Sequence, residues 1–254
     1  MKCAVIGLGE VGSRYAAALL ENGHDVVGFD PVITGVPGVT LVDSPAAAVA
    51  GADAVLVMTG AAVAPAIVDA TIDHLPAGCS YIDLTSASPK VMAALGERVD
   101  ASGAHFVDVA VLGPVSVHGS RTPVMIAGTQ TAVAADLFTA CGADVELLPG
   151  SRPGDAMAHK LLRSVFMKGL ASIICEAMEA AEAADLVDWT RDQVANQLAG
   201  DGYAVIDRFR TGSVTHAKRR AQEMRDTSSY LADLGVPNTM SSASAEYLTN
   251  LGSR

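Results

Sequence analysis

The chain has 254 residues, of which 50% are hydrophobic and 4% aromatic, and its formal net charge is −11. This acidity, without a basic stripe, argues against nucleic acids and anionic membrane surfaces as partners. No run of about 18 apolar residues lacks charges, as a transmembrane helix would require, and the N-terminus lacks a signal-peptide pattern. The four cysteines form no C-x-x-C pair, so neither a disulfide framework nor a metal site is expected. We therefore expect a cytoplasmic protein that acts on a small molecule.

The first thirty residues have the pattern of a dinucleotide-binding unit. An apolar run over Cys3–Ile6 predicts a buried strand, and Gly7-x-Gly9-x-x-Gly12 leads from it into a helical pattern. In this motif the first glycine permits the turn, the second lets a pyrophosphate approach, and the third lets the helix pack on the sheet. A glycine-rich turn of another α/β protein is the alternative. The pattern predicts cofactor contacts from Gly7, Leu8, Gly9, Glu10, Val11 and Gly12.

A second apolar run, Val26–Phe29, ends on Asp30. This acid follows Gly12 at about the 20-residue spacing expected for a carboxylate that accepts the ribose hydroxyls of an adenosine. The following segment, residues 31–42, contains no Lys or Arg that could hold a 2′-phosphate. The sequence therefore favours NAD over NADP, although Asp30 could instead be a solvated acid at a strand end.

Strand and helix patterns then alternate up to about residue 150, which predicts an α/β fold with a doubly wound, mainly parallel sheet. Met58 and Thr59, at the end of one strand, are expected to contact the adenosine side. The expected strands are Val39–Val42, Ala54–Met58, Tyr81–Leu84, His105–Val111, Val124–Ala127 and Val145–Leu148. The expected helices are residues 44–51, 62–74 and 131–140, and a further one that begins at Ser88-Pro89.

A Pro/Gly stretch at residues 149–153 is the one good linker candidate, and everything after it has a helical pattern. We therefore expect a dinucleotide-binding domain over residues 1–152 and a smaller all-helical domain over 153–254. The long helical run from Gly154 is apolar on nearly every face between Leu170 and Ala181, which indicates burial all round. We expect a homodimer to bury it, the alternative being enclosure by the chain's own helices.

Several motifs together resemble the β-hydroxyacid dehydrogenase family, which includes 3-hydroxyisobutyrate and 6-phosphogluconate dehydrogenases. Beside the glycine motif, Asp83–Pro89 (DLTSASP) resembles the family's D-x-S-T-x-S-P segment, and residues 106–113 (FVDVAVLG) occupy the place of its substrate loop. Residues 154–160 (GDAMAHK) fall where the family has G-x-G-x-x-x-K. After residue 160 the chain looks like a compact variant helical domain of a less studied, 6-phosphogluconate-dehydrogenase-like branch.

The resemblance implies that Lys160 is the catalytic residue and that Thr85 and Ser86 contact the nicotinamide ribose or amide. It also implies substrate contacts from Gly113 and Pro114. Here the sequence departs from the family, since Leu112-Gly113-Pro114 replaces Ser-Gly-Gly and Arg163-Ser164 replaces Asn-Asn. Thr85 and Ser86 could alternatively cap the next helix.

Arg163 and Ser164 lie three and four residues after Lys160, so one helix face carries all three side chains. Arg163 could clamp an anionic substrate group, or form a salt bridge to Glu176 or Asp155. A nearby guanidinium and a dry pocket would lower the pKa of the Lys160 amine. His118 follows the substrate loop, and His216, on one helix face with Arg219, could close the site from a partner subunit; both could equally be surface residues.

The sequence thus predicts an NAD-dependent oxidoreductase that acts on a small anionic hydroxy compound. Two alternatives remain open. The first is an imine reductase, which resembles the same family but usually has Asp or Tyr in place of the lysine. The second is a dinucleotide-binding sensor without turnover, which the lost Ser-Gly-Gly and Asn-Asn positions allow.

Overall fold

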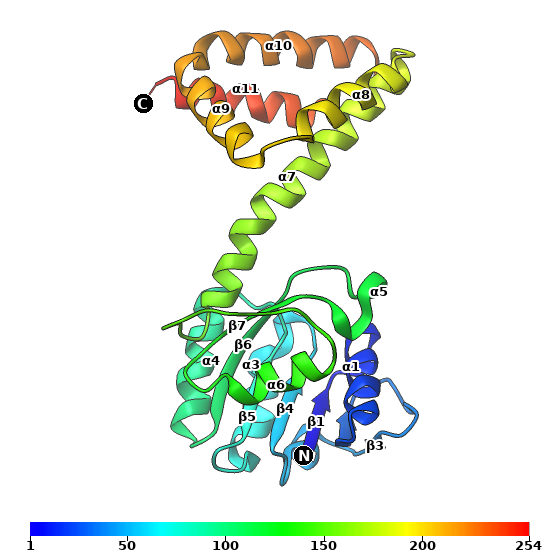
Figure 1. Ribbon diagram of the computed structural model, residues 1–254, viewed down its shortest axis with the longest axis vertical. Helices are drawn as coiled ribbons and strands as arrows, with labels where there is room; N and C mark the ends of the chain where they lie inside the picture. Colours follow the sequence, from blue (N-terminus) through cyan, green and yellow to red (C-terminus); the bar gives the residue numbers. More distant parts are fainter. Residues whose placement is uncertain (254) are drawn as a thin grey trace. The chain divides into compact units, whose positions relative to one another are not determined.

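The computed structural model describes residues 1–253 and confirms the α/β architecture (Figure 1). Within them, one sheet has the order β3-β2-β1-β4-β5-β6-β7-β8, and its neighbouring strands are parallel except β6 and β7. The strands are β1 (Lys2–Ile6), β2 (Asp25–Phe29), β3 (Thr40–Leu41), β4 (Ala54–Val57), β5 (Ser80–Asp83), β6 (His105–Val111), β7 (Val124–Ala127) and β8 (Val145–Leu147).

The helices begin largely where the sequence signals place them. The hydroxyls of Ser44 and Ser88 accept from main-chain amides and begin α2 and α4, each with proline next. The helix expected over residues 62–74 is divided, because Pro65 fits only the first turn of a helix. The helices are α1 (Glu10–Glu21), α2 (Pro45–Val49), α3 (Ala64–Thr71), α4 (Pro89–Ala101), α5 (Val115–His118), α6 (Ala132–Ala140), α7 (Asp155–Ala183), α8 (Val187–Leu198), α9 (Gly202–Thr215), α10 (Ala217–Asp233) and α11 (Thr239–Leu251), with 3₁₀ turns η1 (Ala61–Val63), η2 (Ile72–His74) and η3 (Gly119–Arg121).

Each face of the sheet has its own apolar core. On one face α1 and α6 meet, and the rings of Tyr15 and Phe138 pack edge to face at 5.5 Å. On the other, α2, α3 and α4 cover a core in which Tyr81 and Phe106 stack at 5.7 Å. β1 and β4 are neighbours in the sheet although β2 and β3 intervene in the chain. The carboxyl ends of these two strands are therefore the place where such folds bind ligands.

The chain divides into two compact units, and the division lies inside α7 between Leu162 and Arg163, not at residues 152 and 153. The start of α7 belongs to the first unit because Ala156 and Met157 are buried in its core. We call residues 1–162 the nucleotide unit and the part from Arg163 onward the helical unit.

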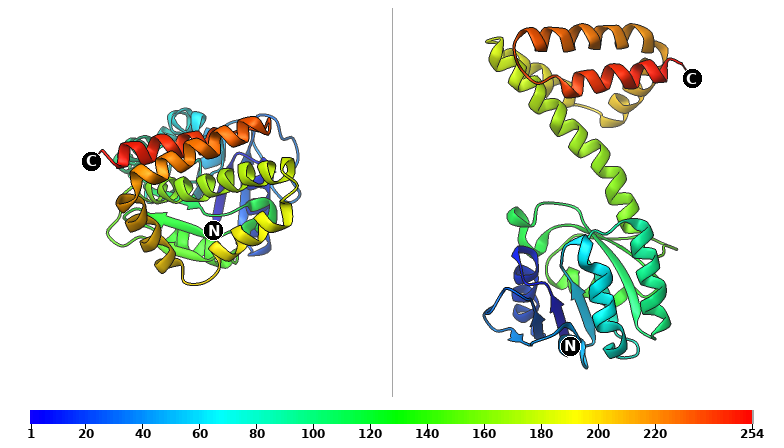
Figure 2. Two further views of the ribbon diagram at one scale, coloured as in Figure 1. Left: turned by 90° about the horizontal axis from the view of Figure 1, so that it is seen from above. Right: turned by 180° about the vertical axis from the view of Figure 1, so that it is seen from behind.

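In the helical unit, α10 and α11 pack side by side (Figure 2). By contrast, α8 and α9 bury no residue. The middle of α7 is not enclosed by the chain's own helices either, since Ile173 is 48% exposed. Within residues 1–253, the chain's own helices thus leave part of this stretch exposed, and the homodimer stays a prediction. Within residues 1–253, no helix is long and apolar enough to cross a bilayer.

Candidate functional site

The glycine turn after β1 has the geometry of a phosphate-binding loop. Gly7 has φ +91°, and a Cβ on Gly12 would lie 1.8 Å from the Gly7 carbonyl oxygen, so helix and strand approach as only glycine allows. A Cβ on Gly9 would meet nothing within 4 Å, which leaves the loop open on its exposed side. No side chain caps the start of α1, so its first amides face outward for an anion.

Asp30 joins the end of β2 to this turn. Its Oδ2 accepts the Leu8 amide at 2.8 Å, and its Oδ1 accepts the amides of Val32 and Ile33 at 2.9 and 3.0 Å. Partial burial raises the pKa of Asp30, but these three hydrogen bonds outweigh burial and hold the pKa below its ordinary value. The carboxylate has about four acceptor positions. One position therefore remains for a ribose hydroxyl. Because Asp30 holds the loop through the Leu8 amide, it is not simply a solvated acid at a strand end.

Met58 and Thr59, at the end of β4, pack closely against the same glycine turn. The Met58 amide donates to the Ile6 carbonyl at 2.8 Å, and a Cβ on Gly7 would lie 2.8 Å from the Met58 oxygen and from Thr59 Cγ2. The buried Thr59 hydroxyl has no hydrogen-bond partner within residues 1–253. An open glycine loop, uncapped amides and an unpartnered hydroxyl together fit a dinucleotide at this edge of the sheet.

Lys160 and Ser86 meet at the same edge. The Lys160 ammonium donates to the Ser86 hydroxyl at 2.7 Å, and Ser86 follows β5 with a left-handed φ of +61°. Thr85 is buried, and its amide donates to Asp83 Oδ1 at 2.7 Å. Neither Thr85 nor Ser86 caps α4, because Ser88 does. The pairing of Ser86 with the lysine is not visible in the sequence motifs.

Asp108 on β6 holds the beginning of the helix that carries Lys160. Its Oδ2 accepts the amides of Gly154 at 2.9 Å and Met157 at 3.2 Å. Gly154 has φ +101°, and a Cβ there would lie 2.5 Å from the Pro89 carbonyl oxygen. The carboxylate therefore caps α7 from a neighbouring element, one turn before the lysine.

Asp83 and Asp108 are opposite each other on adjacent parallel strands. Burial raises the pKa of Asp108 to about 6, against the hydrogen bonds from Met157 and Gly154, and nearby Asp83 adds to the rise. Burial likewise raises the pKa of Asp83. Sequence reasoning named neither acid as a site residue. The available signal was that each is the one acid in a buried strand that belongs to a family motif.

The predicted substrate residues of the nucleotide unit share one exposed loop. The Pro114 carbonyl accepts the amides of Val117 and His118 and so forms α5, and a Cβ on Gly113 would lie 4.0 Å from the His118 ring. Gly113, Pro114 and His118 are thus brought together.

The predicted salt bridges of Arg163 are absent from the part of the chain described. Glu176 instead accepts the amides of Met240 and Ser241 and the Ser241 hydroxyl, and Asp155 accepts the Arg152 amide. The exposed Arg163 and half-buried Ser164 continue along α7 from Lys160, on its face.

His216 lies between α9 and α10 instead of on a helix face, because α9 ends before it and α10 begins after it. Arg219, one turn on, forms an ion pair with Glu223. Among residues 1–253, no three His, Cys, Asp or Glu side chains gather as metal ligands.

The chain belongs to the family defined by the NAD binding domain of 6-phosphogluconate dehydrogenase, whose model matches residues 2–150. This match covers more than half of the chain and assigns residues 2–150 to an NAD-binding domain family. A second model, a domain of unknown function (DUF1932), matches residues 181–251.

Individual relatives agree with this placement. The mitochondrial 3-hydroxyisobutyrate dehydrogenase of Drosophila melanogaster is 29% identical over 136 residues, 49% of this chain and 41% of that protein. The chain spans about half the length of the curated relatives it matches. A conserved hypothetical protein from Sinorhizobium meliloti 1021 shares 26% identity with a TM-score of 0.64, covering 100% of this chain and 89% of that one. A Streptomyces aurantiacus imine reductase has the same fold, with a TM-score of 0.79 at 20% identity over 98% of this chain and 94% of that one.

Proposed function

We propose that this chain is an NAD-dependent oxidoreductase that transfers a hydride between nicotinamide and the CH–OH or C=O carbon of a small anionic hydroxy compound. The observation that carries the proposal is the Lys160–Ser86 hydrogen bond at the edge of the sheet where the glycine loop lies. A bound nicotinamide supplies or takes up the hydride. The protein's own task is then to hold the substrate and to move one proton.

Lys160 Nζ is the group that moves the proton. As an ammonium it donates to a carbonyl oxygen that is becoming a hydroxyl, and as a neutral amine it accepts the alcohol proton in the reverse direction. A positioned acid or base of this kind contributes roughly 10²–10⁴ in rate. Ser86 Oγ accepts from the ammonium at 2.7 Å, which restricts where Nζ can lie, and its own proton remains available as a second donor.

Two acids hold this pair in place through the main chain. Asp83 fixes the amide of Thr85, next to Ser86, and Asp108 fixes the first turn of α7, which carries Lys160. Both act as positioning residues because they bond to backbone and not to the reacting groups.

For the substrate, we assign the anionic group to Arg163, whose guanidinium suits a carboxylate or phosphate. Ser164, four residues after Lys160, lies on the helix face of that lysine. Gly113, Pro114 and His118 form a second group of substrate contacts in the nucleotide unit. His216 is proposed to complete the site from a partner subunit.

The preference for NAD rests on charge. The Asp30 carboxylate, kept ionised by its three amide bonds, would repel a 2′-phosphate, and residues 31–42 offer no cation to offset that repulsion. NADH should therefore bind more tightly than NADPH to the unaltered protein.

We also propose that the active form is a homodimer, formed through the helical unit. Monomeric proteins rarely leave so many large apolar side chains in water, and closed homo-oligomers are the commonest way of covering them. The proposed location is the cytoplasm, where disulfides are rare, and Cys3, Cys79, Cys141 and Cys175 form no disulfide within residues 1–253. The exposed apolar side chains of the helical unit include Val165, Phe166, Ile173, Trp189, Leu198, Tyr203, Ile206, Phe209 and Val214.

The test begins with a spectrophotometric scan of NAD-linked turnover over hydroxy acids, phosphorylated alcohols, sulfonates and cyclic imines. On the best substrate, Lys160→Ala should lower kcat at least about a hundredfold while leaving NADH affinity unchanged. Lys168→Ala removes an exposed lysine from the same helix and is the matched control. Normal turnover by the Lys160 variant would refute its role, faster turnover of imines would favour the reductase, and tight NADH binding without any turnover would favour the sensor.

A further inference from the structure

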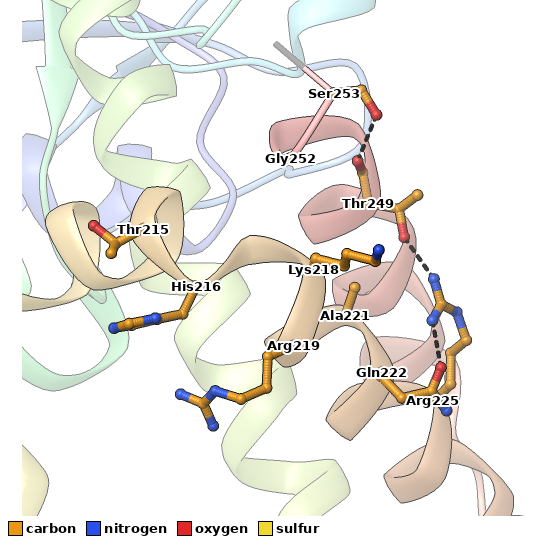
Figure 3. A pocket seen from close by; sticks show the side chains of 10 residues that line it. All are labelled: Thr215, His216, Lys218, Arg219, Ala221, Gln222, Arg225, Thr249, Gly252 and Ser253. Carbon is orange, nitrogen blue, oxygen red and sulfur yellow. Dashed lines mark hydrogen bonds between the residues drawn. The ribbon is translucent and has the colours of Figure 1, made fainter.

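The helical unit contains a hollow of about 810 Å³ beside the start of α10 and the end of α11 (Figure 3). Its lining includes three cationic side chains and no carboxylate. This is notable in a chain whose formal net charge is −11. The residues that line it are Thr215, His216, Lys218, Arg219, Ala221, Gln222, Arg225, Thr249, Gly252 and Ser253.

Arg225 is held in position by neutral groups only. Its Nη1 donates to Gln222 Oε1 at 2.8 Å and its Nη2 to Thr249 Oγ1 at 3.0 Å. The Thr249 hydroxyl in turn donates to the Ala245 carbonyl, which fixes its direction. A guanidinium has five N–H donors, so three remain after these two bonds. The charge of Arg225 is therefore fixed in place and, within residues 1–253, forms no ion pair.

Lys218 lies on the same side of α10 as Arg225 and faces α11 near Thr249 (Figure 3). Within residues 1–253, its ammonium has no hydrogen bond or ion pair. Arg219, by contrast, points to the other side and is paired with Glu223. The two cations that remain uncompensated, Lys218 and Arg225, thus converge on the space between α10 and α11.

We propose that this hollow binds a small polyanion, a molecule with two or more phosphate or carboxylate groups, between Lys218 and Arg225. Two cations that make no ion pair raise the local concentration of anions, and the fixed guanidinium of Arg225 adds directed hydrogen bonds from its free donors. Lys218 and Arg225 have no part in the proposed oxidoreductase site, although His216, which also lines the hollow, is assigned to it; the two substituted cations therefore test the inference separately from the activity.

The experiment is a calorimetric titration of the full chain with inorganic pyrophosphate in one arm and citrate in the other. Because the glycine loop could also take up phosphate, each titration is repeated with saturating NADH. Binding should persist with NADH present, and Arg225→Gln and Lys218→Gln should each weaken it at least about tenfold, the value of one charged hydrogen bond. The arm that binds more tightly identifies phosphate or carboxylate as the preferred group.

Two further variants separate a built site from general charge. Arg210→Gln makes the same charge change at an exposed position of the helical unit outside the hollow, and it should leave binding unchanged. Arg225→Lys keeps the charge but loses the fork, so its affinity should lie between wild type and Arg225→Gln. The proposal is wrong if neither anion binds at millimolar concentration, if NADH abolishes all binding, or if Arg210→Gln weakens binding as much as Arg225→Gln.

Discussion

The two units of this chain differ in how far they bury their large apolar side chains. In the nucleotide unit, large rings such as Tyr15, Tyr81 and Phe138 are completely or almost completely buried. In the helical unit, Trp189 is 62% exposed and Tyr203 85% exposed, although both belong to regular helices. The first unit therefore has its own buried core, whereas the second leaves large apolar side chains exposed.

The largest effect is expected on dimer formation, from substitution of the exposed apolar side chains of the helical unit. Phe209→Glu combined with Trp189→Glu should convert a dimer to monomers, because burying each such side chain is worth about 1.5–3 kcal/mol. Sedimentation over a range of concentrations measures the change. Leu147→Glu is the matched control, since Leu147 is 48% exposed like Phe209 but lies in the nucleotide unit. A wild-type chain that stays monomeric at high concentration would contradict the assembly.

The next effect separates folding from binding in the nucleotide unit. Gly12→Ala places a Cβ 1.8 Å from a carbonyl oxygen, so it should lower the melting temperature and reduce NADH affinity at least about tenfold. Gly9→Ala meets no protein atom and should weaken NADH binding without changing the melting temperature. Gly35→Ala, in an open loop, should alter neither. Equal NADH affinity in all three would show that the dinucleotide lies elsewhere.

A smaller effect is expected at the cap of α7. Asp108→Ala removes the acceptor for two amides and should cost about 1–2 kcal/mol of unfolding free energy, as loss of a helix cap does. It should also lower kcat, because the helix start then moves relative to Ser86. Asp108→Asn can keep one oxygen in the place of Oδ2, so it should retain most of both properties. Unfolding curves and kcat measured together distinguish positioning from stability, and equal kcat for both variants would refute the positioning role.

Much of the nucleotide unit could be predicted because its signals are local. Glycine spacing, strand runs and Ser-Pro helix starts are each set within a few residues, and the predicted and observed strands differ by a residue or two. The link between Asp30 and Leu8 and the cap of Gly154 by Asp108 could not be predicted, because each joins segments far apart in sequence. The same holds for Lys160 and Ser86: motifs gave both residues but not their contact.

The smallest expected effect is a pH dependence that differs in sign between the units. Partial burial raises the pKa of Glu176, but the Ser241 hydroxyl and the amides of Met240 and Ser241 outweigh it and hold the pKa below its ordinary value. Its stabilising contribution is therefore present above the unfolded pKa and is lost as pH falls through the lowered folded pKa. Asp108, whose pKa is raised to about 6, behaves oppositely, because the folded state binds its proton first as the pH falls from about 6 towards 3.8.

Melting curves of wild type, Glu176→Gln and Asp108→Asn between pH 7 and pH 4 measure both signs. At pH 7 the free energy of unfolding of wild type should exceed that of Glu176→Gln by about 1 kcal/mol, because the glutamine amide replaces only part of a charge-assisted hydrogen bond. This difference should shrink once the pH falls below the ordinary pKa of glutamate. Relative to Asp108→Asn, wild type should instead gain stability as the pH falls through 6. If both stability differences moved in the same direction with pH, the environments of the two carboxylates would not be opposite. Hydrogen bonds would then not dominate at Glu176 while burial dominates at Asp108.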